Sequence, residues 1–577
     1  MFAQSPAFTL AAVAALTLGI AANTAIFSVV NAVLLKPLAI PDADRVVVFM
    51  NVSPNGAGPA ASPAKLAHYR LQDQVVQDVA AFNTGVMNFT GGGFPEQLRS
   101  GRVSTDFFKL TGAPVVLGRT FTADEDMPNG PRVTVISKSL WETRFNSDPT
   151  ITGKSISLGD EPYTIVGVHG DFDFRELGPI PQVGVLFGFD PNSADQGHYF
   201  QALGRLKPGV TLQQADARLQ ASAADFRAKF PAAVGAQNTF GVRPIREVIL
   251  GDETRRSLLV YGGAVSFVLL IACANVANLL LVRATGRRRE IAIRAAIGGT
   301  RGRIIRQLLT ESVVLSLAGG LLGLFVGWLG IRALLSVNTA GLPRVGENGA
   351  LVGLDWTVVA FTTVISLATG ILFGLIPALQ SSKTDLTTTL KESAGRSGTG
   401  FRQNKVRSML VVIEVALALV LLIGSALLIR TAVALGRVDP GFDTQNVITM
   451  RMSLKGAKYE KSEAVEQLVR NGVEQLRGIP GVVEASATCC VPLRGGYGLP
   501  FRIVGRPLAA DSQGPFHGGG GWITVSPGYF EVFKIPAKRG RTFTDRDTSA
   551  ATPVASSTRR WRGSTGPTPT RSQTAWS

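Results

Sequence analysis

Five long apolar runs alternate with polar stretches along this chain. The first four contain no Lys, Arg, Asp, Glu or His, and the fifth contains a single charged residue, Glu414. A helix needs about 20 apolar residues to cross the hydrocarbon core of a bilayer, so each run is long enough. The runs are Met1–Leu35, Ser257–Val282, Ser312–Ile331, Trp356–Ser382 and Ser408–Ile429. This pattern predicts a multi-pass α-helical membrane protein with about five spans.

The net charge of +17 is concentrated in two short segments that flank these runs. Arg283–Arg306 contains eight Arg and one Glu, and Lys383–Arg407 contains six basic and two acidic residues. Short loops rich in Lys and Arg lie on the cytoplasmic side of a membrane. Membrane topology therefore accounts for most of the positive charge, and we expect no nucleic-acid partner.

Placing both basic segments in the cytoplasm fixes the topology of the chain. Span one leads outward, spans two to four return the chain to the cytoplasm, and span five leads outward again. Met1–Leu35 lacks the basic start and the short apolar stretch of a signal peptide, so we interpret it as a retained span. The expected segments are span one, 1–35; a first extracytoplasmic domain, 36–254; a membrane domain with spans two to four, 255–382, which includes the basic segment 283–311; a cytoplasmic linker, 383–407; span five, 408–429; a partial second extracytoplasmic domain, 430–547; and a tail, 548–577.

The two extracytoplasmic segments share a short internal repeat. Val103–Phe108 matches Val525–Phe530, and Gly118–Thr122 matches Gly540–Thr544, both at a spacing of 422 residues. Each copy also follows a span. The order span, domain, three spans, span, domain predicts an internal duplication in which the second set of three spans is missing.

Local patterns in both segments are typical of α+β domains. β-branched residues favour strands at Pro131–Ile136 and Pro162–Val168, and amphipathic periodicity favours helices at Gln213–Phe230 and Ser462–Leu476. The fold class that we expect is a multi-pass α-helical membrane protein with two α+β extracytoplasmic domains, the second incomplete.

The tail Thr548–Ser577 does not continue the repeat. It contains no Leu, Ile, Phe, Met, Asp or Glu, but it contains four Arg and many Ser, Thr and Pro. A segment of this composition cannot bury a core. Two explanations stay open: a reading-frame shift or premature end that replaced the rest of the second half, or a native disordered tail.

No catalytic or metal-binding pattern accompanies these segments. Gly153-Lys154-Ser155 resembles the end of an ATP-binding loop, but that pattern needs Gly where the chain has Asp148. The four His residues lack paired-ligand spacing, and no GxSxG motif occurs. We therefore predict no catalytic residue, no metal and no cofactor in this chain, which is not expected to be an enzyme.

The basic segment 283–311 is the strongest candidate for a functional site. Its apolar residues recur at helical spacing with Arg between them, and Gly298-Gly299 is expected to divide it into two short helices. One interpretation is an interfacial helix whose arginines contact anionic headgroups. The other is a helix pair that docks on a cytoplasmic partner. Composition alone favours the first.

Small residues form a stripe in two of the spans. The stripes are Gly319, Gly323 and Gly327 in span three, and Gly370 and Gly374 in span four. This spacing lets helices approach closely in lipid. The glycines are candidates for helix packing, either within the bundle, which we favour, or between two halves of an assembly.

Several of these segments resemble one family of transport proteins. Arg289–Ser312, Gly19–Leu35 and Gly540–Thr544 are similar to the MacB/FtsX-like permeases of ABC transporters. The closest subtype is the large duplicated permeases, which have two MacB-like periplasmic core domains. The resemblance extends from Ser5 to about Asp547. In that family, the segment matching 287–306 contains a coupling helix that contacts a separate ATPase.

The resemblance implies a permease subunit of the bacterial cell (inner) membrane. It would couple ATP hydrolysis by a separate cytoplasmic ATPase, which binds the ATP, to movements of the extracytoplasmic domains for export or extraction of a substrate. One alternative is an FtsX-like signal transducer that activates an external cell-wall hydrolase. Another is an inactive truncated fragment, because the chain lacks the family's basic leader, its last three spans and its second coupling helix.

The resemblance also implies partners and contact residues. The partners are the ATPase, a second permease copy or half, the lipid bilayer and, in some relatives, a periplasmic adaptor. The candidates for contact with the ATPase are Arg287, Arg288, Glu290, Arg294, Gly298, Arg301 and Arg306.

Overall fold

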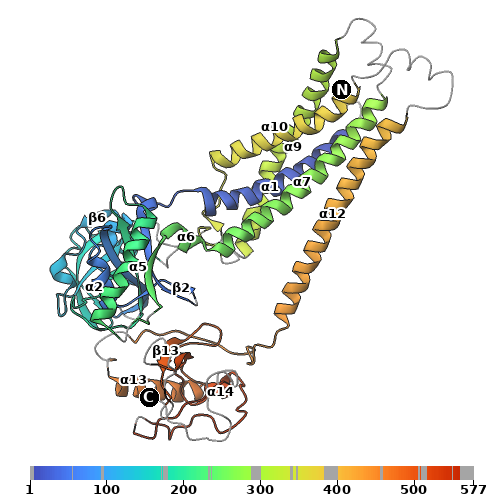
Figure 1. Ribbon diagram of the computed structural model, residues 1–577. Coiled ribbons are helices and arrows are strands. Elements are labelled where there is room, and N and C mark those ends of the chain that lie inside the picture. Colours follow the sequence, from blue (N-terminus) through green and yellow to red (C-terminus); the bar gives the residue numbers. More distant parts are fainter. Residues whose placement is uncertain are drawn as a thin grey trace, which may run out of the picture. The chain divides into compact units, whose positions relative to one another are not determined.

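The structure is a computed structural model of the 577-residue chain. It describes residues 6–54, 56–91, 96–170, 172, 180–231, 234–235, 237–286, 300–337, 342–345, 349–381, 400–454, 459, 461–503, 507, 516–548 and 550–558. The chain divides into two compact units (Figure 1). The membrane unit comprises Met1–Pro37 and Ile249–Val438, and the extracytoplasmic unit comprises Leu38–Val248 and Asp439–Ser577.

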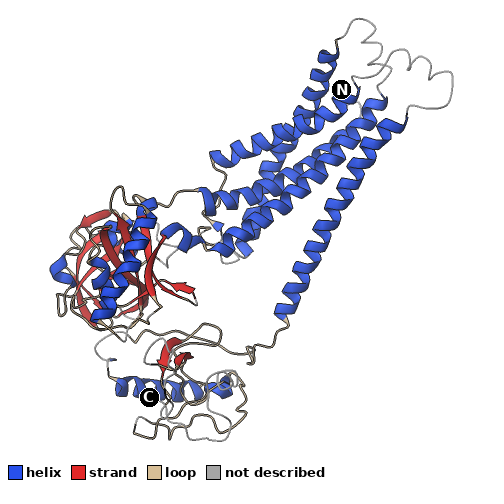
Figure 2. Ribbon diagram, viewed as in Figure 1, coloured by secondary structure: helices blue, strands red, loops and turns tan. Residues whose placement is uncertain are grey.

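Among the described residues, five long helices form the membrane unit, and all of them are drawn in blue in Figure 2. Each contains a stretch that is long and apolar enough to cross a membrane, so the expectation of about five spans is confirmed. The helices are α1, Pro6–Val30, continued by the π-helical turn η2, Asn31–Leu35; α7, Asp252–Gly286; α9, Arg301–Val337; α10, Trp356–Ser381; and α12, Gly400–Gly436.

Helix α1 packs against three of the other spans, α7, α9 and α10. Its Leu16 is buried in one apolar cluster with Cys273 of α7 and Leu315 of α9. Towards the other end of α1, the ring of Phe27 stacks on that of Phe361 from α10, with 3.8 Å between the centroids. Span one is therefore held inside the bundle by contacts along its length.

Helix α12 touches the rest of the bundle mainly through α7. Its Leu410 is buried with Ala274, Ala277 and Leu281 of that helix. None of the residues in its most apolar window is buried by other described parts of the chain. A helix that is apolar on all sides is suited to contact with lipid.

The first extracytoplasmic domain is built on a 12-stranded mixed sheet. Its main strand order is β12-β1-β11-β4-β5-β10-β7-β9-β6, with β2, β3 and β8 paired at the side of this path. The strands are β1, Val46–Ser53; β2, Gly56–Gly58; β3, Ala60–Ala61; β4, Val76–Phe89; β5, Glu96–Val103; β6, Val115–Gly118; β7, Val133–Ser137; β8, Ser155–Leu158; β9, Glu161–His169; β10, Val183–Leu186; β11, Phe200–Leu206; and β12, Thr239–Pro244.

Short helices connect these strands and cover the sheet. They are η3, Ala43–Arg45; α2, Pro63–Arg70; α3, Phe107–Thr111; η4, Ala123–Asp126; α4, Lys138–Phe145; α5, Leu212–Lys229; and α6, Ile245–Leu250. Strands β7 and β9 and helix α5 confirm the elements expected from the sequence. Thr211 caps α5 by accepting a hydrogen bond from the Gln214 amide, and the Gln214 side chain accepts one from the Thr211 amide in return.

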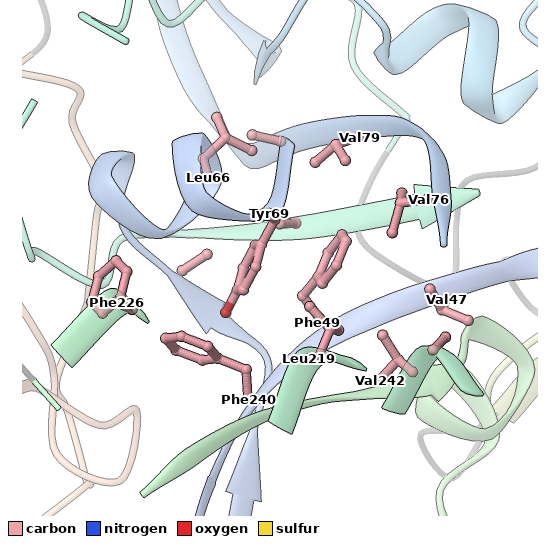
Figure 3. Close-up of a cluster of buried hydrophobic side chains, with 14 of the residues drawn as sticks. Val47, Phe49, Leu66, Tyr69, Val76, Val79, Leu219, Phe226, Phe240 and Val242 are labelled. Carbon is pink, nitrogen blue, oxygen red and sulfur yellow. The ribbon is translucent and has the colours of Figure 1, made fainter. Parts of the chain in front are cut away.

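The main apolar core of this domain lies between α2, α5 and the strands β1, β4, β11 and β12 (Figure 3). Phe49 of β1 stacks on Tyr69 of α2, with 4.2 Å between the ring centroids, and Tyr69 meets the edge of Phe240 from β12 at 5.5 Å. Burial raises the pKa of Tyr69. A second apolar cluster lies between β7, β9 and β10 and includes Leu140 of α4.

Among its described residues, the second extracytoplasmic segment contains fewer regular elements than the first domain. They are α13, Ser462–Arg477; the hairpin of β13, Tyr497–Phe501, and β14, Gly518–Trp522; and α14, Tyr529–Val532. Helix α13 confirms the second amphipathic helix expected from the sequence. In the tail, residues 550–558 contain no helix or strand, and residues 559–577 lie outside the described part of the chain.

Candidate functional site

The basic segment 283–311 connects α7 to α9. Five of its seven candidate residues lie outside the described part of the chain: Arg287, Arg288, Glu290, Arg294 and Gly298. Arg301 is the first residue of α9, and Arg306 is exposed on the same helix. The structure thus places the last two candidates in the first two turns of α9.

The second half of this segment differs from the expectation of a separate short helix. Arg301 to Glu311 are continuous with span three in one helix of 37 residues. Apart from Gly302 in the first turn, the stretch contains no helix-breaking residue, so the helix passes directly into the membrane. The proposed turn at Gly298-Gly299 lies outside the described residues.

One contact shows which end of α1 lies beside this segment. The guanidinium of Arg283, at the start of the basic segment, lies 4.6 Å from the ring centroid of Phe8 in the first turn of α1. An arginine over an aromatic face at this distance is attracted to the ring. The N-terminal end of α1 therefore lies on the same side of the bundle as the basic segment, which the uncharged first 35 residues could not indicate.

The glycine stripe of α9 lies directly against α1. A methyl group added at Gly319 would lie 2.8 Å from Cβ of Leu16, and one at Gly327 would lie 2.7 Å from the carbonyl oxygen of Ala21. Gly323 is similarly close to Ile20. Only a hydrogen in place of a side chain permits this approach, so the stripe serves packing within the bundle.

The glycines of α10 lie against α9 in the same way. A methyl group at Gly370 would clash with Oγ of Ser316, and one at Gly374 would lie 2.6 Å from Cβ and Oγ of Ser312. Together the two stripes connect α10, α9 and α1 in series.

Polar side chains add hydrogen bonds between the spans, which our sequence reasoning missed. Asn23 of α1 donates to the carbonyl of Val265 in α7 at 2.8 Å. The hydroxyls of Thr24 in α1 and Thr362 in α10 lie 3.0 Å apart, within hydrogen-bond distance. The available signal was the presence of Asn and Thr inside an otherwise apolar run.

At the outer end of the bundle, an arginine from the loop between spans three and four reaches the end of span one. Arg344 is only 9% exposed and donates to the backbone carbonyls of Val33, Lys36 and Pro37 at 3.1, 2.7 and 2.8 Å. The last carbonyls of a helix have no partner within the helix, so such donors cap it. The sequence offered no signal for this role.

Asp355 makes a second connection at the same place. Its carboxylate caps α10 through the Val358 amide at 3.0 Å, accepts from the side chain of Asn31 at 2.7 Å and pairs with Lys36 at 3.1 Å. Partial burial favours a higher pKa for Asp355, but the Val358 amide, Lys36 and Asn31 together hold it below its ordinary value.

In the extracytoplasmic unit, a second arginine holds the residues that follow span one. Arg205 of β11 is 6% exposed and donates to the carbonyls of Pro41 and Leu110. The same guanidinium lies 3.5 Å from the carboxylate of Asp42 and 3.7 Å from that of Asp78. The start of this domain is thus fixed to its central sheet.

A buried lysine lies elsewhere in the same domain. Lys65 of α2 is 3% exposed, and its Nζ lies 2.5 Å from Oδ1 of Asn51 and 2.5 Å from Nε2 of His198. Burial lowers the pKa of Lys65 to about 8. Among the described residues, no group of three His, Cys, Asp or Glu side chains is placed to hold a metal ion.

Local geometry recurs at the spacing of the sequence repeat. Arg119 forms a double hydrogen bond with Glu125 at 2.6 and 2.9 Å, and Arg541 does so with Asp547 at 2.6 and 2.6 Å, 422 residues later. The same spacing relates two further ring pairs, each with 5.9 Å between the centroids: Phe108 with Phe121, and Phe530 with Phe543.

Two family models match the chain. A model described as MacB-like periplasmic core domain matches residues 9–222, and one described as FtsX-like permease C-terminal matches residues 262–386. The chain belongs to the MacB/FtsX-like family of ABC transporter permeases. It is a multi-pass protein of the bacterial cell (inner) membrane with large extracytoplasmic domains.

Similar curated proteins are named as an ABC transporter permease or as export ATP-binding/permease proteins. The chain is 28% identical over 285 residues to an uncharacterized ABC transporter permease, YknZ, of Bacillus subtilis, covering 49% of this chain and 67% of that permease. It is 30% identical over 290 residues to a macrolide export ATP-binding/permease protein, MacB, of Agrobacterium fabrum, covering 49% and 42%. It is 28% identical over 362 residues to a pyoverdine export ATP-binding/permease protein, PvdT, of Pseudomonas aeruginosa, covering 59% and 49%. The chain thus spans less than half the length of the latter two proteins.

Similar solved structures include two isolated extracytoplasmic regions. The periplasmic region of MacB from Actinobacillus actinomycetemcomitans is 13% identical, with a TM-score of 0.27, and covers 37% of this chain and 92% of that one. The extracellular domain of the transporter YknZ from Gram-positive bacteria is 15% identical, with a TM-score of 0.26, and covers 34% and 99%.

Proposed function

We propose that this permease couples ATP hydrolysis by a separate cytoplasmic ATPase to movements of its extracytoplasmic domains, for export or extraction of a substrate. The observation that carries this proposal is the match of the FtsX-like permease model to residues 262–386. That range contains the whole basic segment 283–311, in which the family has its coupling helix.

Two sequence facts support a partner that binds ATP. The alignment with YknZ covers 67% of a protein that is named as a permease alone, whereas the alignment with MacB covers only 42% of a protein named for both ATP binding and permease. The chain itself contains no GxxxxGK[ST] motif. ATP would therefore bind to the partner.

The helix geometry supports a path for the movement. Helix α9 begins at the cytoplasmic side and continues without interruption for 37 residues, about 55 Å at 1.5 Å per residue. Its glycine stripe fits closely against α1, which leads into the first extracytoplasmic domain. A displacement of the cytoplasmic end of α9 would thus shift α1, because close-packed helices cannot separate without loss of contact.

Further partners belong to the same proposal. A second permease copy or half rests on the family resemblance, and the uncovered apolar window of α12 supports the lipid bilayer as a partner. A periplasmic adaptor rests on the family resemblance alone.

A pull-down tests the proposal. The tagged full chain is extracted from native membranes, and bound proteins are identified by mass spectrometry. We expect an ABC ATPase with the wild type and its loss with Arg294→Glu/Arg301→Glu, which reverses two charges in the coupling segment. Arg332→Glu is the matched control, because this exposed arginine lies near the opposite end of α9. An ATPase that stays bound after the double reversal would contradict the assignment of the segment.

A further inference from the structure

We infer that Arg344 is the positioning residue through which the loop between spans three and four controls the outer end of span one, and with it the start of the first extracytoplasmic domain. The inference rests on the proposed function, because it names the place where movement of the spans is passed on. It starts from the three carbonyls that Arg344 contacts.

These carbonyls lie where span one ends. Helix α1 closes in the π-helical turn η2, and the Lys36 amide donates back to the Asn31 carbonyl at 2.8 Å. The carbonyls of Val33, Lys36 and Pro37 then follow one another along the chain as it leaves the helix. One guanidinium serves all three, with Nη1 bonding to two of them and Nη2 to the third. The fork of donors on Arg fits this task, whereas an ammonium group presents no such fixed fork.

Described residues on both sides of Arg344 in the chain are packed into the bundle. Val345, next to Arg344, and Val352 are 2% and 7% exposed, in a cluster with Val33 of η2 and Leu335 of α9. Arg344 also adopts a positive φ of 63°. A non-glycine residue in this conformation is uncommon, and it persists where the surrounding contacts determine the backbone. Arg344, Val345 and Val352 therefore belong to the packed bundle together with α9 and η2.

Asp355 provides a second set of contacts to the end of span one. Its carboxylate is bound to the first turn of α10 through the Val358 amide and to span one through Asn31 and Lys36. Residues 31–37 are thus bound at two points: Arg344 binds their backbone carbonyls, and Asp355 binds the side chains of Asn31 and Lys36.

Only three residues lie between Pro37, which Arg344 binds, and Pro41, which is bound to the sheet of the extracytoplasmic domain. Pro37 is the last carbonyl bound by Arg344, and Pro41 is bound by Arg205 of that domain. Leu38 and Ile40, which lie between them, are 8% and 5% exposed. The four residue steps from the Pro37 carbonyl to the Pro41 carbonyl span at most about 14 Å. Once this stretch is fully extended, any further shift of the outer end of span one must therefore move the domain.

The first measurement is hydrogen exchange of the full chain in nanodiscs, comparing wild type with Arg344→Gln. We expect the amides of residues 33–40 to exchange about tenfold faster in the variant, because hydrogen bonds from a charged group are lost. Arg344→Lys should show an intermediate exchange rate, since it retains the charge but loses the fork of donors. If Arg344→Gln does not fold, Arg344→Lys replaces it in the comparison. Arg332→Gln is the control, because the Arg332 guanidinium lies over the ring of Trp328 within α9 and not against residues 31–37. Unchanged exchange in Arg344→Gln would overturn the inference.

The second measurement separates a coupling role from a merely structural cap. The ATPase recovered with the wild type is reconstituted with each variant, and exchange of β1 is compared without nucleotide and with ATP plus vanadate. We expect the variant Arg344→Gln to retain the ATPase and its basal hydrolysis but to lose the nucleotide-dependent change in β1. A retained change would overturn the inference while leaving the proposed function intact. Absence of any change in the wild type would contradict the proposed function itself, and the coupling role with it.

Discussion

Gly327 shows how a single position limits the packing of two spans. A methyl group there would lie 2.7 Å from a backbone oxygen of α1, while one at Gly330, on the same helix, would meet nothing within 4 Å. We expect Gly327→Leu to destabilise the bundle by about 1–3 kcal/mol, as overpacking does. Gly330→Leu should leave stability unchanged. Thermal unfolding of the detergent-solubilised chain, followed by size-exclusion chromatography, measures both; equal behaviour of the two variants would contradict the placement of α1 against α9.

The buried Lys65 leads us to expect that the stability of the first extracytoplasmic domain depends on pH. Its pKa is about 8 in the folded domain, against an ordinary value of 10.5, so the folded state binds the proton less readily than the unfolded chain does. The stability that the neutral amine contributes is fully present above pH 10.5 and is lost as the pH falls towards 8. Between these values the stability of the wild type should rise by about 1.4 kcal/mol per unit of pH.

The variant Lys65→Met isolates this effect. Hydrogen exchange of strands β1 and β11 in the full chain, measured between pH 8 and 9.5 and corrected for intrinsic rates, should show the rise in protection with the wild type alone. The same pH dependence in both proteins would exclude Lys65 as its source.

At the scale of elements, the continuity of α9 is the feature on which the transmission path depends. Gln307 is exposed in the part of α9 that we had expected to form a separate short helix. Proline inside a helix removes a hydrogen bond and costs about 3 kcal/mol. We expect Gln307→Pro to uncouple ATP hydrolysis by the partner ATPase from the chain, with Gln307→Ala as the control. If Gln307→Pro behaves like the alanine variant, then α9 does not transmit movement as a rigid element.

The elements differ in how far the sequence could predict them. The five spans follow from hydropathy, because lipid admits only long apolar helices, and α5 is marked by its cap and its periodicity. The order of strands was not predictable, since β1 pairs with β11 and β12, whose residues lie more than 150 positions further along the chain. Such pairings leave no local pattern.

The candidate site shows the same division. Glycine spacing predicted close helix packing, but the partner helix emerged only from the structure. Arg344 contacts carbonyls 307 to 311 residues earlier in the chain, so no motif of neighbouring residues could reveal it. The coupling residues, in contrast, rest on a family resemblance, and five of the seven lie outside the described residues.

At the scale of the whole molecule, the topology can be tested with single thiols. Cys489 is exposed in the second extracytoplasmic segment, and Arg303 is exposed near the start of α9. In spheroplasts carrying Cys273→Ser/Cys490→Ser, we expect Cys489 to react with a membrane-impermeant maleimide. With Cys489→Ser added, the thiol of Arg303→Cys should react only after permeabilisation. Labelling of both from outside would contradict the placement of the basic segment in the cytoplasm.

The central claim is that this permease works with an ATPase through the segment 283–311. Its most direct test is the rate of ATP hydrolysis by the recovered ATPase in nanodiscs with the wild-type chain, with Arg294→Glu/Arg301→Glu and with no chain. We expect the wild type to change the rate severalfold and the charge reversals to return it to the rate without the chain, while Arg332→Glu behaves as wild type. A rate that is the same in all cases, with the chain inserted and intact, would contradict the account.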